Sequence, residues 1–309
     1  MKNKKKSICI TSAFYNEEEN LENFIKNFNK TRSKLLKMGY SINLVLVNDG
    51  STDGSVKIVK KAILLKKFIK LISLKKNYGQ QIAIYVGLKE IKADFYGVLD
   101  SDCQQNSNLF IQMINQLKSK KLELLQMKKK YGNYESLIKK SLSEFFYYIF
   151  SKITNVDIKP GSSDFYLFTH KVRNKVISSN ISKFFLRGFI HLNSLKKEYL
   201  EYLPAKRPKG TSKYNIFNQL NFAFTAIYLY GNKIFMNIFI SFFVVNAFLM
   251  MFIIFKNSLF NLITQGSTIF VTLFISFVVI NLIFYCLIIF FLIKIETNKF
   301  VNPKYKIEK

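Results

Sequence analysis

The most informative stretch of this sequence is Tyr96-Gly97-Val98-Leu99-Asp100-Ser101-Asp102. Its apolar residues run into two aspartates, which predicts a buried parallel strand whose carboxyl end opens into a site. Open α/β sheets bind their ligands at those carboxyl ends. In an extended chain Asp100 and Asp102 point to the same side, where their charges repel unless a cation lies between them. Because Mg²⁺ commonly binds one or two carboxylates plus substrate phosphates, the pattern indicates either a metal site or a strand-end turn with two solvated aspartates.

Strand and helix patterns alternate on either side of this stretch. Helical spacing of apolar residues predicts amphipathic helices, and short apolar runs predict strands. The alternation predicts an α/β fold with a doubly wound, mostly parallel sheet. The expected strands are residues 7–13, 42–47, 70–74 and 95–99, and the expected helices are residues 17–38, 53–67, 80–91 and 109–121.

A second informative segment is Val47-Asn48-Asp49-Gly50-Ser51-Thr52-Asp53-Gly54-Ser55, between a strand and a helix. Its glycines permit a tight turn, and its Ser, Thr and Asp residues can cap the helix that follows. Asp49 stands at the strand end, where its carboxylate can accept hydrogen bonds from a base or a ribose. Alone this segment could be a structural turn, but its place at a sheet edge shared with Asp100 favours a nucleotide site.

Two further segments occupy equivalent places. Ala13-Phe14-Tyr15-Asn16-Glu17-Glu18-Glu19-Asn20 ends the first strand, and Lys76-Asn77-Tyr78-Gly79-Gln80-Gln81 opens a later helix. Glu18 and Glu19 suit the positive end of a helix dipole, which explains them without a functional role.

The composition narrows the functional classes. Lys and Arg number 47 against 19 Asp and Glu, for a formal net charge of +28 at pH 7. This balance favours anionic partners such as phosphorylated substrates or lipid headgroups. No nucleic-acid-binding signature accompanies the charge, so we expect no nucleic-acid partner. Cys9, Cys103 and Cys286 are odd in number and lack metal-ligand spacing, which fits a reducing compartment.

Two uncharged apolar segments, residues 234–255 and 268–293, are each long enough to cross a bilayer. The alternative is a pair of buried helices in a soluble protein. Lysines before the first segment and after the second predict that both termini are cytoplasmic, as expected for an integral protein of the cytoplasmic (inner) membrane. Asn246 and Asn281 lie mid-segment, where a polar side chain usually faces another helix, and this indicates packing within the hairpin or a homo-oligomer.

The chain therefore divides into four expected parts. These are a cytoplasmic α/β domain (1–215), a juxtamembrane amphipathic segment (216–232), two transmembrane helices (233–294) and a basic cytoplasmic tail (295–309).

Taken in order, these segments resemble the inverting family-2 glycosyltransferases with the GT-A fold. They resemble more closely the polyprenyl-phosphate glycosyltransferase branch, which includes dolichyl-phosphate mannose synthases and bactoprenol glucosyltransferases. The resemblance covers about residues 7–214, and the two trailing apolar segments fit the same branch. The matching positions are Tyr15 to Glu18, Asn48 to Ser55, Asn77 and Gly79, then Asp100, Asp102 and Gln104, then Gly161, Asp164 and Phe165, then Arg187 and Gly188, and finally Arg207, Gly210, Ser212, Lys213 and Tyr214.

The resemblance implies a Rossmann-like GT-A domain followed by a C-terminal two-helix transmembrane hairpin. It implies inverting, metal-dependent transfer of a single sugar from a UDP- or GDP-sugar to a polyprenyl phosphate such as undecaprenyl phosphate. The reaction would take place at the cytoplasmic membrane face. The alternative acceptor is a lipid-linked or surface-polysaccharide saccharide.

The resemblance also implies roles for particular residues. The nucleotide sugar would contact Tyr15, Glu17, Asp49 and Asp100, and Mg²⁺ or Mn²⁺ would be held by Asp100, Asp102 and Gln104. The catalytic residues would be Asp102 and Asp164, with Asp164 on the acceptor side as a base or a positioning residue. Phosphate groups and the acceptor would be bound by Arg187, Arg207, Ser212 and Lys213.

Some positions depart from the family pattern. Ala13 and Asn106-Ser107 stand where prolines are usual, and Lys128 to Lys130 stand where relatives carry arginines near the donor phosphates. Because Lys lacks the bidentate fork of Arg, the phosphate contact there would differ. His170 and His191 match no motif, and we interpret both as structural or surface residues.

Three other functional classes fit less well. A processive synthase of the cellulose or hyaluronan kind usually carries Gln-x-x-Arg-Trp, whereas this chain has no Trp. A non-enzymatic membrane scaffold has no reason to keep Asp100, Asp102, Gln104 and Asp164. A membrane-anchored nucleic-acid binder is suggested by charge alone.

Overall fold

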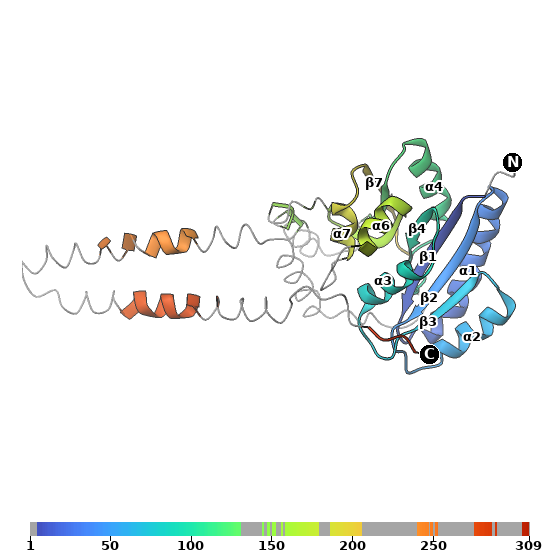
Figure 1. The fold of residues 1–309 in the computed structure, drawn as a ribbon, viewed down its shortest axis with the longest axis horizontal. Helices are drawn as coiled ribbons and strands as arrows, with labels where there is room; N and C mark the ends of the chain where they lie inside the picture. The colour runs from blue at the N-terminus through green and yellow to red at the C-terminus, as the bar shows by residue number, and fades with distance from the viewer. Residues whose placement is uncertain are drawn as a thin grey trace, which may run out of the picture. The chain divides into compact units, whose positions relative to one another are not determined.

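The structure is a computed structural model, and Figure 1 shows its fold. The chain divides into two compact units, one made of residues 1–227 and 302–309 and the other of residues 228–301. The structure describes residues 5–130, 144, 147–148, 150–152, 156, 158–178, 186–205, 240–246, 248–249, 251–252, 275–285, 288 and 305–308.

A seven-stranded sheet forms the centre of the first unit. Its strands are, in sheet order, β3 (Ile69–Ser73), β2 (Ser41–Asn48), β1 (Ser7–Phe14), β4 (Phe95–Val98), β6 (Ser162–Thr169), β5 (Leu124–Lys129) and β7 (Lys197–Tyr202). β1 pairs in parallel with β2 and β4, and β2 pairs in parallel with β3. β5 and β7 are also parallel, whereas β6 runs antiparallel to both of its neighbours, β4 and β5. The mostly parallel sheet predicted from the sequence is confirmed.

Helices cover both faces of this sheet (Figure 1). One hydrophobic cluster joins the sheet to α1 (Glu18–Lys37), α2 (Ser55–Leu65) and α4 (Leu109–Ser119). A second cluster on the opposite face joins it to α3 (Gln80–Glu90), α6 (His170–Ser178) and α7 (Leu186–Leu192). The doubly wound arrangement is therefore confirmed, and each helix and strand expected up to α4 begins and ends within about two residues of its predicted limit.

β2 shows why the central strands have continuous apolar sequences. Leu44 and Leu46 belong to the cluster on one face, and Val45 and Val47 belong to the cluster on the other. All four are fully buried. A strand covered by helices on both faces needs apolar residues at every position, so the alternation of a half-exposed strand is lost.

The strand order reverses between β1 and β4. The chain builds outward from β1 through β2 to β3 and then returns to the other side of β1 at β4. In doubly wound sheets such a switch point leaves a crevice beyond the carboxyl ends of the two strands, where ligands bind. The loops that follow β1, β2 and β4 therefore meet where the sequence predicts a site.

In the second unit the described residues are helical, and their longest runs are residues 240–246 and 275–285. The expected juxtamembrane segment lies outside the described residues, as do large parts of the two expected spans. None of the helices in the described part of the chain combines the length and the apolar character needed to cross a membrane. Asn281 Nδ2 donates a hydrogen bond to Asn246 Oδ1 at 3.0 Å. The two asparagines therefore contact each other, while packing of a transmembrane hairpin or a homo-oligomer stays a prediction.

Candidate active site

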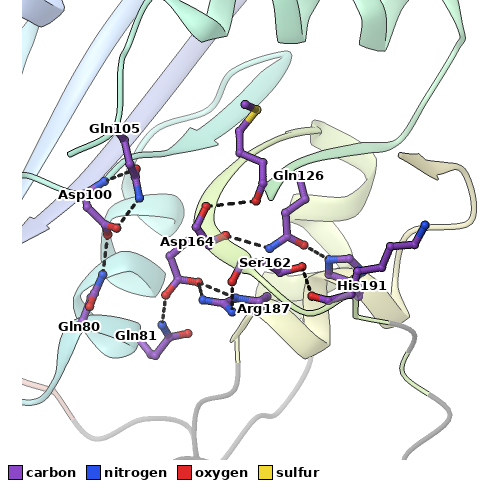
Figure 2. A network of polar contacts seen from close by, with 12 residues as sticks. Gln80, Gln81, Asp100, Gln105, Gln126, Ser162, Asp164, Arg187 and His191 are labelled. Carbon is purple, nitrogen blue, oxygen red and sulfur yellow. Dashed lines mark hydrogen bonds and ion pairs between the residues drawn. The ribbon is translucent and has the colours of Figure 1, made fainter. Parts of the chain in front are cut away.

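Asp100 follows β4 and is enclosed by amide groups (Figure 2). Gln80 Nε2 donates to Asp100 Oδ1 at 2.8 Å, Gln105 Nε2 donates to Asp100 Oδ2 at 2.5 Å, and Gln105 Oε1 accepts the Asp100 backbone N–H at 3.0 Å. Asp100 keeps partial solvent exposure, but burial of its carboxyl raises its pKa to about 8, and the charges of Asp164 and Asp102 add to the rise. A fully ionised Asp100 is therefore unfavourable at neutral pH without a nearby cation.

Asp164 on β6 forms an ion pair with Arg187 on α7. Arg187 Nη2 and Nε lie 2.9 and 3.0 Å from Asp164 Oδ1, and the two side chains are only 12% and 11% exposed. Arg187 Nη1 donates to the Ser162 carbonyl at 2.6 Å and to the Tyr147 hydroxyl at 3.2 Å. Burial is the largest single influence and lowers the pKa of Arg187, but the charge and hydrogen bond of Asp164, together with Tyr147 and Tyr166, raise the pKa overall. The structure thus joins a predicted catalytic residue directly to a predicted phosphate-binding residue.

Two consecutive glutamines at the start of α3 bridge the two carboxylates. Gln80 binds Asp100, and Gln81 Nε2 donates to Asp164 Oδ2 at 2.9 Å (Figure 2). Their neutral amides give each carboxylate a donor and hold the two carboxylates in fixed places. No sequence pattern pointed to a role for Gln80, Gln81 or Gln105. The available signal was their position beside matched motif residues, in the segment that opens α3 and in the loop after β4.

Asp49 has a buried carboxylate that holds the loop before α3. Its Oδ1 accepts the Tyr78 backbone N–H at 2.7 Å, and its Oδ2 accepts the Gly79 backbone N–H at 2.9 Å. Asp49 is only 3% exposed, and burial raises its pKa although the two hydrogen bonds oppose the rise. The structure therefore gives Asp49 a part in fixing the backbone at the site, and its contact with a nucleoside stays a prediction.

Tyr15 and Glu17 lie on the loop after β1, which interlocks with the turn after β2. The Asn16 backbone N–H donates to Ser51 Oγ at 3.0 Å, and the Thr52 backbone N–H donates to Asn16 Oδ1 at 2.8 Å. Asn16 adopts a φ of 52°, a left-handed conformation that asparagine tolerates. Tyr15 is 37% exposed. Because this loop lies at the same sheet edge as Asp49, the predicted nucleoside contacts of Tyr15 and Glu17 fit its position.

Asp102 and Gln104 continue along the loop that Asp100 begins. Asp102 Oδ1 accepts the Gln104 backbone N–H at 3.1 Å, and both residues are partly exposed. Within the described part of the chain, no group of three or more His, Cys, Asp and Glu side chains could hold a metal. Two carboxylates still fit a Mg²⁺ or Mn²⁺ ion that completes its coordination with substrate phosphates. The raised pKa of Asp100 supports this fit, because a cation stabilises the ionised carboxylate.

Arg207, Ser212 and Lys213 lie outside the described residues. The chain that leads to them is attached to the site, because the Ala205 backbone N–H donates to the Gln104 carbonyl at 2.9 Å. The phosphate-binding and acceptor-binding roles of the three residues stay predictions.

A hydrogen-bond network that includes buried Gln126 and His191 lies to one side of Asp164 (Figure 2). Gln126 Nε2 donates to the Ser163 carbonyl at 2.9 Å, and Gln126 Oε1 contacts His191 Nε2. Because an amide oxygen only accepts, the imidazole proton lies on Nε2, and Nδ1 can accept from the Tyr199 hydroxyl 3.5 Å away. His191 is 2% exposed, which supports its interpretation as a structural residue. The network ties β5 to β6 and α7, the two elements that carry Asp164 and Arg187.

Comparison with known proteins identifies relatives of the first unit. The model of the family described as Glycosyl transferase family 2 matches residues 7–181, which is more than half of the chain. The chain is 27% identical over 224 residues to the uncharacterized glycosyltransferase YkcC of Bacillus subtilis (strain 168), covering 72% of this chain and 68% of that protein. It is 24% identical over 223 residues to the prophage bactoprenol glucosyl transferase homolog of Escherichia coli (strain K12), covering 71% of each.

A solved structure has a similar fold. The glucosyl-3-phosphoglycerate synthase from Mycobacterium tuberculosis, in complex with Mn²⁺, UDP-glucose and phosphoglyceric acid, aligns with a TM-score of 0.51 and 14% sequence identity. The alignment covers 72% of this chain and 78% of that chain.

Proposed function

The chain belongs to glycosyl transferase family 2 and is a glycosyltransferase that uses nucleotide sugars, and we propose that its acceptor is a polyprenyl phosphate. In this proposal a single sugar passes from a UDP- or GDP-sugar to the lipid phosphate, with inversion at the anomeric carbon. The observation that carries the proposal is the ion-paired Arg187 and Asp164 beside Asp100, at the switch point of the sheet. The similarity to proteins named bactoprenol glucosyl transferases supports the choice of acceptor.

On the donor side, the loops after β1 and β2 would hold the nucleoside. Tyr15 and Glu17 lie on the loop after β1. Asp49 lies on the loop after β2 and binds the backbone of Tyr78 and Gly79, just before α3. These loops are locked to each other by hydrogen bonds, so the pocket would be preorganised before the nucleotide binds.

Asp100 and Asp102 would hold a divalent metal ion, with Gln104 on the same loop. When bound, Mg²⁺ or Mn²⁺ neutralises charge that develops on the leaving diphosphate. Asp100 would bind in its ionised form, which its buried position disfavours in the metal-free protein. The amides of Gln80 and Gln105 keep the Asp100 carboxylate oriented, and each oxygen retains a second lone pair.

On the acceptor side, the Asp164–Arg187 pair would position the attacking phosphate. A phosphate oxygen is already anionic near neutral pH, so the reaction does not need a strong base. Asp164 binds Arg187 directly, and this contact favours a positioning role for Asp164 over removal of a proton. Arg187 supplies a fixed positive charge where the acceptor phosphate approaches, and Arg207 and Lys213 would add further cations.

Two features support a membrane-bound enzyme with its catalytic domain on the cytoplasmic face. The segments 234–255 and 268–293 carry no charge, and lysines flank both. A lipid phosphate is confined to the membrane, so an enzyme that uses it gains from being anchored there.

The proposal is tested with purified full-length protein, undecaprenyl phosphate, Mn²⁺ or Mg²⁺, and a panel of labelled UDP- and GDP-sugars. We expect label from one donor in the organic phase, lost with EDTA and in Asp102→Asn. The control variant Glu90→Gln should retain the activity, because Glu90 forms only an exposed ion pair with Lys70. Donor hydrolysis or transfer to an added saccharide, without lipid label, would overturn the lipid-phosphate acceptor.

A further inference from the structure

The C-terminal strand, our name for residues 305–308, pairs through a single bridge with the chain where the edge strand β3 ends. β3 is an edge strand, and an edge strand leaves a row of backbone groups without partners. Ile307 forms an antiparallel bridge with Leu74, directly after β3. The Lys75 N–H donates to the Lys306 carbonyl at 2.9 Å, and the Glu308 N–H donates to the Ser73 carbonyl at 2.8 Å. In Figure 1 the C-terminus accordingly lies beside β3.

The segment that this strand pairs with leads directly into the candidate site. Only a few residues after Lys75, the backbone N–H groups of Tyr78 and Gly79 bind the carboxylate of Asp49. The next two residues are the glutamines that bind Asp100 and Asp164.

This loop has little room to move independently of the turn after β2. A Cβ atom added at Gly50 would lie 2.5 Å from the backbone of Lys76 and of Asn77. The loop between Lys75 and Gly79 is therefore packed directly against the turn that carries Asp49.

The C-terminal strand also contacts the far end of α3. Tyr305 packs against the hydrophobic cluster on the α3 face of the sheet, and Lys89 Nζ lies 3.5 Å from the Tyr305 hydroxyl. Lys89 is in the last turn of α3. The strand thus touches α3 near its end through Tyr305 and binds the backbone of Lys75, a few residues before α3 begins.

We propose that the C-terminal strand is a positioning element of the active site. By pairing with the edge of β3 it holds the loop of residues 75–79, and through that loop it sets the places of Asp49, Gln80 and Gln81. The proposal goes beyond the reaction itself and does not depend on which acceptor is used.

Two substitutions at one position separate the backbone contact from the side chain. Glu308→Pro removes the N–H that donates to Ser73, whereas Glu308→Ala keeps that N–H and removes only the carboxylate. In full-length protein without substrate, hydrogen exchange at Tyr78 and Gly79 should be about 2- to 10-fold faster in Glu308→Pro than in Glu308→Ala. Exchange at Leu125 in β5, which is fully buried and far along the sheet order, should not differ.

Equal exchange at Tyr78 and Gly79 in the two variants would overturn the proposal. If Glu308→Pro increased exchange everywhere, including at Leu125, the variant Tyr305→Ala would be tested in its place. Exchange at Tyr78 and Gly79 that is equal in Tyr305→Ala and Glu308→Ala would then also overturn the proposal. The readout needs no sugar transfer, so it stays informative if the proposed acceptor is wrong. In a second measurement, which rests on the proposed function, the KM for the nucleotide sugar should rise more in Glu308→Pro than in Glu308→Ala.

Discussion

The Asp100 carboxyl has a pKa that makes the stability of the metal-free protein depend on pH. Its pKa is about 8 in the folded chain against 3.8 as the ordinary value, because it is buried and lies near Asp164 and Asp102. The folded state therefore holds this proton more tightly than the unfolded state does. The stabilisation that comes from protonated Asp100 is therefore complete below about pH 4 and is lost as the pH rises towards 8.

We therefore expect the melting temperature in EDTA to fall between pH 5 and pH 8 by at least about 2–4 °C. The measurement is thermal unfolding at a series of pH values, for the wild type and for Asp100→Asn. The decrease should be smaller in Asp100→Asn, which has no proton to lose, and Mn²⁺ should reduce it in the wild type. The same slope in Asp100→Asn would show that other groups cause it.

The ion pair of Asp164 and Arg187 gives a second prediction at the residue scale. Asp164→Asn leaves the buried Arg187 without its counter-ion, so we expect a loss of about 3–5 kcal/mol in the free energy of unfolding. Sugar transfer should fall at least about tenfold, because Arg187 loses the partner that orients it.

Urea unfolding and initial transfer rates measure the two effects. Glu90→Gln is the matched control, because its pair with Lys70 is exposed and should contribute about 0–1 kcal/mol. An Asp164→Asn protein with wild-type stability and rate would contradict the role given to this pair.

At the scale of the secondary structure, the turns before α1 and α2 cap each other. The Gly54 backbone N–H donates to Glu18 Oε2 at 2.8 Å, and the Glu18 backbone N–H donates to Asp53 Oδ2 at 3.2 Å. Glu18 was expected only to suit the dipole of its own helix, but it also satisfies a donor at the start of α2. The two loops that we propose to hold the nucleoside are therefore stabilised together.

The close approach of the turn after β2 to the loop before α3 predicts a specific effect at Gly50. Gly50 has a φ of 75°, and a Cβ there would lie 2.5 Å from backbone atoms. Gly50→Ala should destabilise the protein by about 1–3 kcal/mol and raise the KM for the nucleotide sugar. Gly39→Ala is the control, since Gly39 has a φ of 85° but nothing within 4 Å of an added Cβ. Equal effects of the two substitutions would show that backbone strain alone matters and that the close approach does not.

At the scale of the whole molecule, the C-terminal strand constrains how the chain can cross a membrane. Residues 305–308 belong to the same compact unit as the sheet and pair with residues beside β3. A chain that leaves a domain and returns to it must cross any intervening bilayer an even number of times. This requirement agrees with the two spans proposed from the sequence.

We therefore expect a cysteine introduced at Ser258, between the two spans, to react with a membrane-impermeant maleimide in intact cells. A cysteine at Lys309 should react only after the membrane is permeabilised. Both variants are made in a chain whose native cysteines are replaced by serine. Labelling of both positions from the same side would contradict the hairpin.

The sequence alone determined most elements of the first part of the chain. Local periodicity predicted the strands and helices up to α4, because a strand buried on both faces needs an unbroken apolar run and a surface helix needs one apolar stripe. The places of Asp49 and Asp100 followed from the same reasoning, since Asp49 directly follows β2 and Asp100 comes just after β4. The resemblance to family-2 glycosyltransferases then placed Asp164 and Arg187 among the candidate site residues.

Which of these residues meet, and what holds them in place, depends on the tertiary fold. Asp164 contacts Arg187 because β6 enters the sheet antiparallel between β4 and β5, an arrangement that no local pattern indicates. Gln80, Gln81 and the C-terminal strand acquire their contacts from residues distant in the chain. Apolar periodicity reports whether a residue is buried, whereas the partner of a polar side chain depends on long-range strand pairing. For that reason the elements could be predicted from the sequence, and the network that positions the site could not.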